Sequence, residues 1–310
     1  MREHSGDRLN PTTTPLVGSL CTGYGGLDMA AEQVYGARTA WVADPAPGPA
    51  AILAHNYPNI PNIGDLNSID WANTPPVDII TAGFPCQPVS LSGRRGGIDD
   101  DRWLLDDILD GIQQLPRRPR RLVFENVRGL LSANDGEAMR RVVHGLAEHG
   151  FLARWRILRA SDAGAPHQRP RVFLVAVDTL RLGDRVGPPR GGDAGEEPAG
   201  VGVAPDPVAP GSLPEEGVCD PDLWGRFQEP IRRWENVVGR SAPYPAEQGP
   251  KSPRLSMKWL EWFMGLPDGW VTGVPGLSYS AQRHALGNGV VPQQAAAAIA
   301  DLETWPNPTT

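Results

Sequence analysis

Cysteine is scarce in this sequence. Only Cys21, Cys86 and Cys219 occur among 310 residues, and they lack the paired spacing of a zinc site. A low and odd number of cysteines also argues against a disulfide framework. We therefore expect neither a metal centre nor disulfide bridges, and one reactive cysteine stays open as a possibility.

Long apolar runs are missing as well. No stretch reaches the roughly 18 apolar residues that a membrane helix requires, although 40% of all residues are apolar. The first 15 residues are polar and lack the apolar stretch of a secretory signal. We expect no membrane association and a cytoplasmic location.

An excess of positive charge is also absent, since the formal net charge is −7. Taken alone, this value argues against a nucleic-acid-binding protein. Binding depends on where the charge lies, however, and arginines do cluster locally. The clusters are Arg94 with Arg95, the segment 117–121, Arg140 with Arg141, Arg169 with Arg171, and Arg232 with Arg233. Most of them are expected to be solvated surface.

Alternating apolar patterns are what the sequence does contain. Strand-like runs occupy 16–20, 39–43, 77–82, 121–124 and 171–177. Helical patterns occupy 27–34, 50–55, 103–115, 137–149, 295–302, and stretches from about 229 and about 256. This alternation predicts an α/β fold, a doubly wound and mostly parallel sheet with helices on both faces. Ligands then bind at the carboxyl ends of the strands.

The composition changes near residue 178. From 181 to about 221 the chain is rich in Gly, Pro and acidic residues and shows little periodicity. We expect a loop-rich insert there, and we find no internal repeat.

The motif CTGYGG, residues 21–26, lies between a predicted strand and a predicted helix. Its glycines allow a tight turn and a close approach of the backbone to a ligand. Asp44 follows the next strand and suits a ribose, while Asp65 in the next loop suits an adenine amino group. The turn alone does not distinguish a dinucleotide from S-adenosylmethionine.

The motif GFPCQPVS, residues 83–90, follows the strand predicted at 77–82. Prolines on both sides hold Cys86 rigidly at the strand end. A nucleophilic cysteine acts as its thiolate, so amides or cations nearby should lower its pKa. The alternative is an inert buried cysteine.

Two further strand ends carry charged residues. Glu125 ends a strand in FENV, and an acid next to a nucleophile forms a plausible catalytic pair. Arg169 and Arg171 stand two apart in QRPR at the head of a strand, where alternation predicts that both face one side. Such a pair suits a phosphate or a ring carbonyl, or else an ion-paired strand edge.

Taken in order, these blocks resemble the cytosine-5 DNA methyltransferase family. The matching pieces are CTGYGG, GFPCQPVS, FENV, QRPR, MGLPDGW and ALGNGVVPQQ, which span about 17–300. The resemblance implies the Rossmann-like fold of S-adenosylmethionine-dependent methyltransferases. It also implies a catalytic domain at 1–179 and 281–310 and a small, loop-rich target-recognition domain at 180–280, with the insert at 181–221.

The resemblance implies a role for each catalytic residue. Cys86 would attack carbon 6 of a flipped cytosine, and Glu125 would hold and protonate ring nitrogen 3. Arg171, with Arg169 near it, would help to hold the base. No metal is required.

The resemblance also implies ligand contacts. S-adenosylmethionine would bind at Cys21, Thr22, Gly23, Gly25, Gly26, Leu27, Asp44, Asp65, Leu66, Pro85, Asn288, Gly289 and Val290. Double-stranded DNA would contact Gln87, Ser90, Arg94, Arg95, Arg226, Arg232, Arg233 and Arg240. We expect a monomer that acts alone or beside a cognate restriction endonuclease in a restriction-modification system.

The sequence departs from the family at two cofactor positions. The family commonly has an aromatic residue where Cys21 stands, and a ribose-binding glutamate where Val42 stands. Asp44 is the nearest substitute, two residues later. Three alternatives remain: methylation of transfer RNA, a DNA-binding regulator without activity, and a nucleotide-dependent oxidoreductase. The oxidoreductase leaves GFPCQPVS and FENV unexplained.

Overall fold

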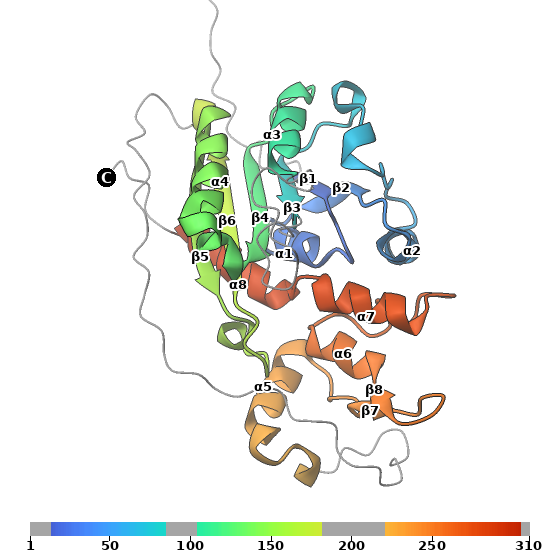
Figure 1. Ribbon diagram of the computed structural model, residues 1–310. Coiled ribbons are helices and arrows are strands. Elements are labelled where there is room, and N and C mark those ends of the chain that lie inside the picture. The colour runs from blue at the N-terminus through green and yellow to red at the C-terminus, as the bar shows by residue number, and fades with distance from the viewer. Residues whose placement is uncertain (1–13, 85–103, 182–220, 305–310) are drawn as a thin grey trace, which may run out of the picture.

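A six-stranded sheet forms the centre of the larger part of the protein (Figure 1). The computed structural model describes residues 14–84, 104–181 and 221–304. The strands are β1 (Leu16–Leu20), β2 (Arg38–Ala43), β3 (Ile79–Ala82), β4 (Arg121–Val127), β5 (Phe151–Leu158) and β6 (Arg171–Asp178). Their order is β2-β1-β3-β4-β6-β5. β1 to β4 pair in parallel, whereas β6 runs antiparallel to both β4 and β5, so the predicted mostly parallel sheet is confirmed.

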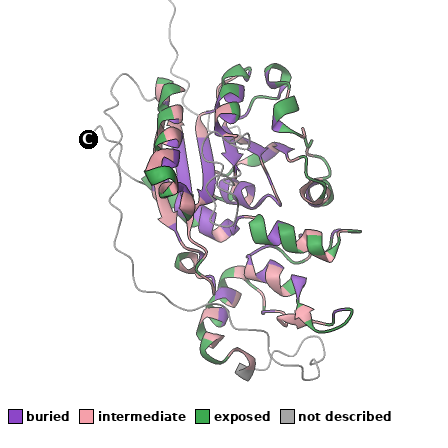
Figure 2. Ribbon diagram, viewed as in Figure 1, coloured by how far each residue is buried: buried purple, intermediate pink, exposed green. Residues whose placement is uncertain are grey.

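Helices cover both faces of this sheet. α1 (Gly26–Tyr35) and α8 (Pro292–Thr304) pack on one face, and α3 (Leu105–Gln114) and α4 (Glu137–Glu148) pack on the other. Strand alternation separates the two apolar clusters, because successive side chains point to opposite faces. In β4, Leu122 and Phe124 join the α3/α4 cluster, whereas Val123 joins the α1/α8 cluster. The central strands are accordingly buried, whereas the edge strand β5 is mostly half-buried (Figure 2).

The chain order reverses between β1 and β3. From β1 the chain passes through α1 to β2 on one side, and then crosses back through α2 (Pro47–Asn56) to β3 on the other. A ligand crevice forms at such a switch point, beyond the carboxyl ends of the strands. The 21–26 turn and residues 83–84 both lie at this end of the sheet.

The C-terminal third lies below this end of the sheet in Figure 1. It contains a 3-10 segment (Pro221–Phe227), α5 (Gln228–Val238), the short hairpin strands β7 (Ala246–Glu247) and β8 (Arg254–Leu255), α6 (Met257–Phe263) and α7 (Tyr279–Asn288). Its apolar cluster is built around Trp234 and Trp262, both fully buried. Tyr24 and Ile52 join the same cluster, so this part packs directly against the ligand end of the sheet.

The sequence patterns did not predict β5, α7 or the two-residue strands β7 and β8. β5 has arginines at 154 and 156 between apolar residues, and six of its eight residues are only half-buried. Because β5 is an edge strand, it lacks the continuous apolar run by which the other strands were predicted. α7 was missed because its polar and small residues, YSAQRHALGN, bury only Ala285 and Leu286.

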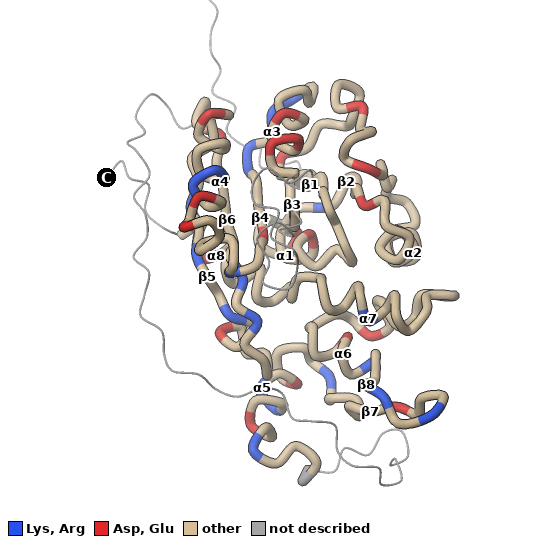
Figure 3. The backbone as a smooth tube through the Cα atoms, viewed as in Figure 1, with Lys and Arg blue, Asp and Glu red and all other residues tan. Residues whose placement is uncertain are grey.

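The arginine cluster at 117–121 takes part in ion pairs that hold elements together. Arg117 binds Asp78 at 2.8 Å, Arg118 binds Asp178 at 2.9 Å and Arg121 binds Glu303 at 2.7 Å. Figure 3 shows negative residues on α3 and residues of both signs on α4. These arginines therefore form no unpaired positive surface.

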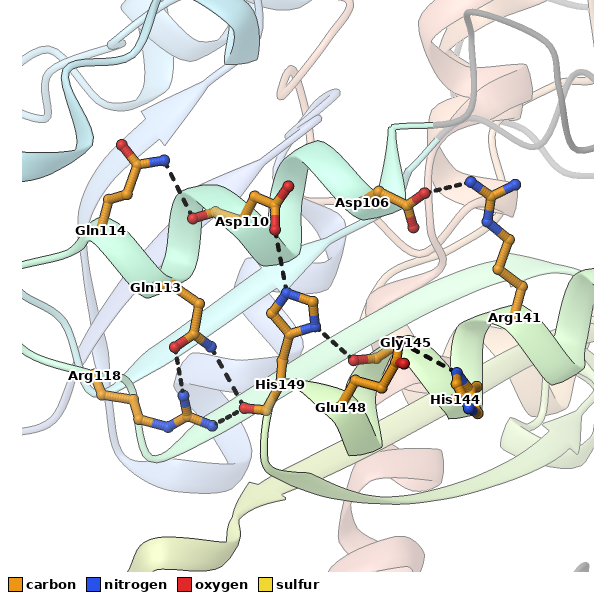
Figure 4. A network of polar contacts seen from close by, with 10 residues as sticks. All are labelled: Asp106, Asp110, Gln113, Gln114, Arg118, Arg141, His144, Gly145, Glu148 and His149. Atoms are coloured by element: carbon orange, nitrogen blue, oxygen red, sulfur yellow. Dashed lines mark hydrogen bonds and ion pairs between the residues drawn. The ribbon is translucent and has the colours of Figure 1, made fainter.

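A polar network joins α3 to α4 (Figure 4). His149 lies 3.2 Å from Asp110, and Arg141 pairs with Asp106. Arg118 donates to Gln113 at 3.0 Å and to the carbonyl of His149.

Within the described segments, no helix is long and apolar enough to cross a membrane.

Candidate active site

The CTGYGG motif forms a turn with an unusual backbone. Cys21, Gly23 and Gly25 all have positive φ, at 49°, 60° and 88°. This conformation is costly for most residues but open to glycine, which explains the spacing of the two glycines. The Thr22 hydroxyl receives the Ala43 N–H at 3.2 Å and lies 3.3 Å from the Ser19 carbonyl, so it ties the turn to β1 and β2.

The 289–290 segment packs against this turn although it is far away in the sequence. A Cβ atom on Gly289 would lie 1.9 Å from the Tyr24 ring, and one on Gly26 would lie 2.2 Å from the Val290 carbonyl. The Tyr24 hydroxyl donates to that carbonyl at 2.8 Å. By contrast, a Cβ atom on Gly23 would meet nothing within 4 Å. The turn is therefore tightly packed against residues 289 and 290, and it is open beside Gly23.

Two carboxylates stand near this opening. Asp44 accepts the Gly23 N–H at 2.9 Å and the Ala46 N–H at 3.0 Å. Burial raises the pKa of Asp44, and these two amides oppose the rise. Asp65 is exposed and accepts the Asn67 N–H at 3.0 Å, next to the buried Leu66.

The departures at Cys21 and Val42 have clear structural consequences. Burial, and then the charges of Asp44 and Asp65, raise the pKa of Cys21 to about 12, so its thiol stays protonated. Val42 is fully buried, with its backbone paired to Pro61 and Ile63. A side chain at position 42 therefore points into the core, and Asp44 is the first carboxylate that reaches the opening.

Glu125 and Arg171 form a buried ion pair at the carboxyl end of β4. Glu125 is 8% exposed, and Arg171 Nε lies 2.9 Å from Glu125 Oε1. Burial raises the pKa of Glu125, and the charges of Arg171 and Arg169 oppose this rise without cancelling it. The carboxyl group therefore holds a proton to a higher pH than a free glutamate does.

Arg169 has a different position from the one that strand alternation predicted. β6 begins only at Arg171, and Arg169 lies before it with a positive φ of 37°. Alternation along a strand therefore does not place the two arginines together, although both lie near Glu125. Arg169 Nη2 instead donates to the carbonyls of Gly287 at 2.9 Å and Gly289 at 2.7 Å.

Gly83 and Phe84, which precede the predicted nucleophile Cys86 in the sequence, lie beside Glu125 and Asn126. Asn126 Nδ2 donates to the Phe84 carbonyl at 3.1 Å, and a Cβ atom on Gly83 would lie 3.7 Å from Glu125 Oε2. Asn126 was not predicted as a site residue, although its place directly after Glu125 in FENV was a usable signal. The predicted site residues Pro85, Cys86, Gln87, Ser90, Arg94 and Arg95 lie outside the described residues.

The four remaining candidate DNA contacts lie in the C-terminal third. Arg226, Arg232 and Arg233 are exposed, and Arg233 donates weakly to the Gly164 carbonyl at 3.4 Å. Arg240 differs, because its guanidinium binds Asp268 at 3.1 Å and the Leu266 carbonyl at 2.7 Å.

Comparison with known proteins adds sequence relatives and fold neighbours. The chain is 31% identical to the type II methyltransferase M.NgoBI of Neisseria gonorrhoeae over 50% of this chain and 48% of that protein. It is 34% identical to M2.BsuMI of Bacillus subtilis strain 168, over 51% of this chain and 41% of that protein. The chain thus matches about half, or less, of the length of these relatives.

Solved structures share the fold over nearly the whole chain. A Dnmt2 methyltransferase of S. pombe superposes with a TM-score of 0.59 at 16% identity, covering 93% of this chain and 98% of that one. The methyltransferase EhMeth of Entamoeba histolytica gives 0.62 at 15% identity, with coverage of 94% and 98%. At these identities the likeness shows the fold alone.

The family assignment rests on the larger part of the chain. Residues 16–182, more than half of the 310, match the family of C-5 cytosine-specific DNA methylases. The matched range contains the 21–26 turn, Glu125, Arg169 and Arg171. The chain therefore belongs to the C-5 cytosine-specific DNA methylase family.

Proposed function

We propose that this protein is a DNA methyltransferase that transfers a methyl group from S-adenosylmethionine to carbon 5 of a flipped cytosine in double-stranded DNA. One observation carries the proposal. The buried Glu125–Arg171 pair lies beside Gly83 and Phe84, the residues that lead directly to Cys86. A proton donor and a nucleophile on adjacent strand ends are the two groups that this reaction requires.

Cys86 is the proposed nucleophile. Its thiolate attacks carbon 6 of cytosine, which forms a sulfur–carbon bond and shifts electron density toward carbon 5 and ring nitrogen 3. Glu125 donates its proton to nitrogen 3 and so neutralises the charge that the attack creates. Burial raises the pKa of Glu125, which favours the protonated form that this step requires. Carbon 5, made nucleophilic in this way, would take the methyl group of S-adenosylmethionine, with S-adenosylhomocysteine as the leaving group. A water molecule then removes the carbon-5 proton, cleavage of the sulfur–carbon bond restores the Cys86 thiolate, and nitrogen 3 returns its proton to Glu125.

Two arginines support this acid in different ways. Arg171 holds one carboxyl oxygen of Glu125 at 2.9 Å and leaves the other directed toward residue 83. Arg169 holds the carbonyls of Gly287 and Gly289 and so fixes the C-terminal segment over the site. Both arginines are therefore proposed as positioning residues.

The family and the fold imply the use of S-adenosylmethionine, which supplies the methyl group when bound. The residues present fit such a ligand. The backbone is open at Gly23, and carboxylates at positions 44 and 65 suit hydroxyl and amine groups. The proposed contacts are the same thirteen residues that the sequence predicts, from Cys21 to Val290, with Asp44 in place of the ribose-binding glutamate.

Double-stranded DNA is the proposed substrate, and the segment 180–280 is proposed as the recognition region. Arg226, Arg232 and Arg233 suit phosphate contacts, because they are exposed and carry no strong ion pair among the described residues. Arg240 is already engaged by Asp268, so we expect a smaller contribution from it. A companion restriction endonuclease fits the type II enzymes that this chain resembles.

The test is transfer of labelled methyl from S-adenosylmethionine to unmethylated genomic DNA, with transfer RNA as a parallel substrate. We expect 5-methylcytosine in one short recurring DNA motif, and no transfer by Cys86→Ser, which should still bind DNA. DNA that contains 5-fluorocytosine should trap a covalent adduct, since fluorine does not leave as a proton. Methylation of transfer RNA alone would replace the substrate, and DNA binding without transfer would favour a regulator.

A further inference from the structure

Trp270 donates a hydrogen bond to the backbone of the 21–26 turn. Its indole Nε1 lies 2.8 Å from the carbonyl oxygen of Tyr24, which stands at the centre of the turn. The contact joins residues separated by 246 positions, and Trp270 belongs to the loop that follows α6. This hydrogen bond links the C-terminal third directly to the proposed cofactor site.

Tyr24 is held on two sides at once. Its ring is fully buried, and its hydroxyl donates to the Val290 carbonyl at 2.8 Å. The Trp270 hydrogen bond holds the backbone end of the same residue. The ring and the peptide of Tyr24 are therefore fixed by two separate C-terminal segments.

Trp270 is itself held by the end of α2. Asn56 Nδ2 donates to the Trp270 carbonyl at 2.8 Å. The Tyr57 ring packs edge-on against the indole, with centroids 5.6 Å apart and planes at 79°. These contacts fix the direction of the indole N–H, because they hold both the backbone and the ring.

The loop that carries Trp270 is shaped by one buried carboxylate. Glu261 is fully buried and accepts the backbone N–H groups of Gly269 at 2.9 Å, Val271 at 2.5 Å and Thr272 at 2.9 Å. The Thr272 hydroxyl adds a fourth hydrogen bond at 3.0 Å. The residues on both sides of Trp270 are thus bound to α6, so the indole reaches the turn from a rigid base.

The turn requires such a restraint. Cys21, Gly23 and Gly25 have positive φ, and glycine-rich backbone of this kind has many alternative conformations. We propose that Trp270 is a positioning residue for cofactor binding, which sets the Tyr24–Gly25 peptide in the orientation that receives S-adenosylmethionine. The proposal rests on the proposed function. It gives a role in ligand binding to a residue that lies outside 16–182, the range that matches the family.

The test compares Trp270→Phe with Trp259→Phe. Both tryptophans are half-buried and both pack on another aromatic ring, but Trp259 Nε1 has no hydrogen-bond partner among the described residues. The first substitution removes the N–H that binds Tyr24, and the second removes an unpaired N–H. Affinity for S-adenosylhomocysteine is measured by isothermal titration calorimetry, together with kcat and the KM values for S-adenosylmethionine and DNA.

We expect Trp270→Phe to bind S-adenosylhomocysteine about three- to tenfold more weakly, the range of one lost hydrogen bond. The KM for S-adenosylmethionine should rise by a similar factor, whereas kcat and the KM for DNA should stay near the wild-type values. Trp259→Phe should leave the affinity unchanged. Asn56→Ala should weaken binding in the same direction, and should add little to Trp270→Phe because both act through one hydrogen bond.

Several outcomes would overturn the assignment. Equal affinity in wild type and Trp270→Phe removes the positioning role while leaving the proposed function intact. An equal loss in Trp259→Phe, or a fall in kcat alone, identifies general packing as the cause. Wild-type protein that neither binds S-adenosylhomocysteine nor transfers methyl refutes the proposed function itself, and the role of Trp270 with it.

Discussion

Asp28 is a buried carboxylate that should make the protein less stable as the pH rises. It lies in the first turn of α1 and is 1% exposed. The Thr81 hydroxyl donates to Oδ1, whereas Oδ2 has no hydrogen-bond partner in the part of the chain that the structure describes. Burial raises the pKa of Asp28 from 3.8 to about 6, and the hydroxyls of Thr81 and Ser19 oppose this rise.

The sign and the size follow from linkage between protonation and folding. The pKa of Asp28 is higher in the folded protein than in the unfolded chain. The stability linked to its protonation is therefore fully present below about pH 4 and is lost as the pH rises through 6. A difference of about two pKa units corresponds to about 3 kcal/mol. Asp28→Asn removes the ionisation, so this variant should gain up to about 3 kcal/mol over the wild type at pH 8 and little at pH 4.

Urea unfolding at a series of pH values from 4 to 8 measures this difference directly. Asp78→Asn is the matched control with the opposite slope. Burial raises the pKa of Asp78, but the hydrogen bonds from Arg117 and from the Leu16 N–H outweigh it, so the pKa is lowered. The stability that Asp78 contributes is therefore lost as the pH falls. If the free energies of unfolding of Asp28→Asn and the wild type change in parallel from pH 4 to 8, Asp28 does not have the raised pKa that its burial predicts.

Three further substitutions test the site. Glu125→Gln should reduce methyl transfer at least a hundredfold and leave DNA affinity nearly unchanged, as single-turnover and gel-shift assays would show. Gly289→Ala places a methyl group 1.9 Å from the Tyr24 ring, so urea unfolding should reveal a loss of about 1–3 kcal/mol and calorimetry a weaker affinity for S-adenosylhomocysteine. Gln294→Leu leaves the buried carbonyls of Leu158 and Arg169 without their donor, which should cost about 1–3 kcal/mol for each; unchanged stability would contradict that role.

The sequence was sufficient for most of the sheet because local patterns determine it. β1 was predicted with its observed ends, and β2, β3, β4 and β6 were predicted within a few residues. Each of these strands is a buried apolar run, which is what periodicity detects. β5 and α7 were missed for the converse reason, since their stability comes from packing against neighbours and not from an apolar pattern of their own.

The site was predictable only in part. CTGYGG, Glu125 and the arginine pair were identified from motifs. The structure brings the 21–26 turn together with residues 289–290, and Glu125 together with Arg171. The partners of these residues were not predictable. Asn126 on the Phe84 carbonyl and Trp270 on the Tyr24 carbonyl are side chain to backbone contacts between distant segments, and no residue type at any fixed spacing encodes them.

The C-terminal third completes the site that the family match outlines. Three contacts carry this conclusion: Arg169 binds the carbonyls of Gly287 and Gly289, the Tyr24 hydroxyl binds Val290, and the Trp270 indole binds Tyr24. Each joins a residue within 16–182 to one beyond it. A chain that ended at residue 182 would keep Glu125 and the turn but lose all three restraints. A ligand that must itself order a loose turn binds more weakly, because part of its binding energy is used for the ordering. By holding the 21–26 turn in place, the C-terminal third therefore contributes to ligand affinity without itself performing chemistry.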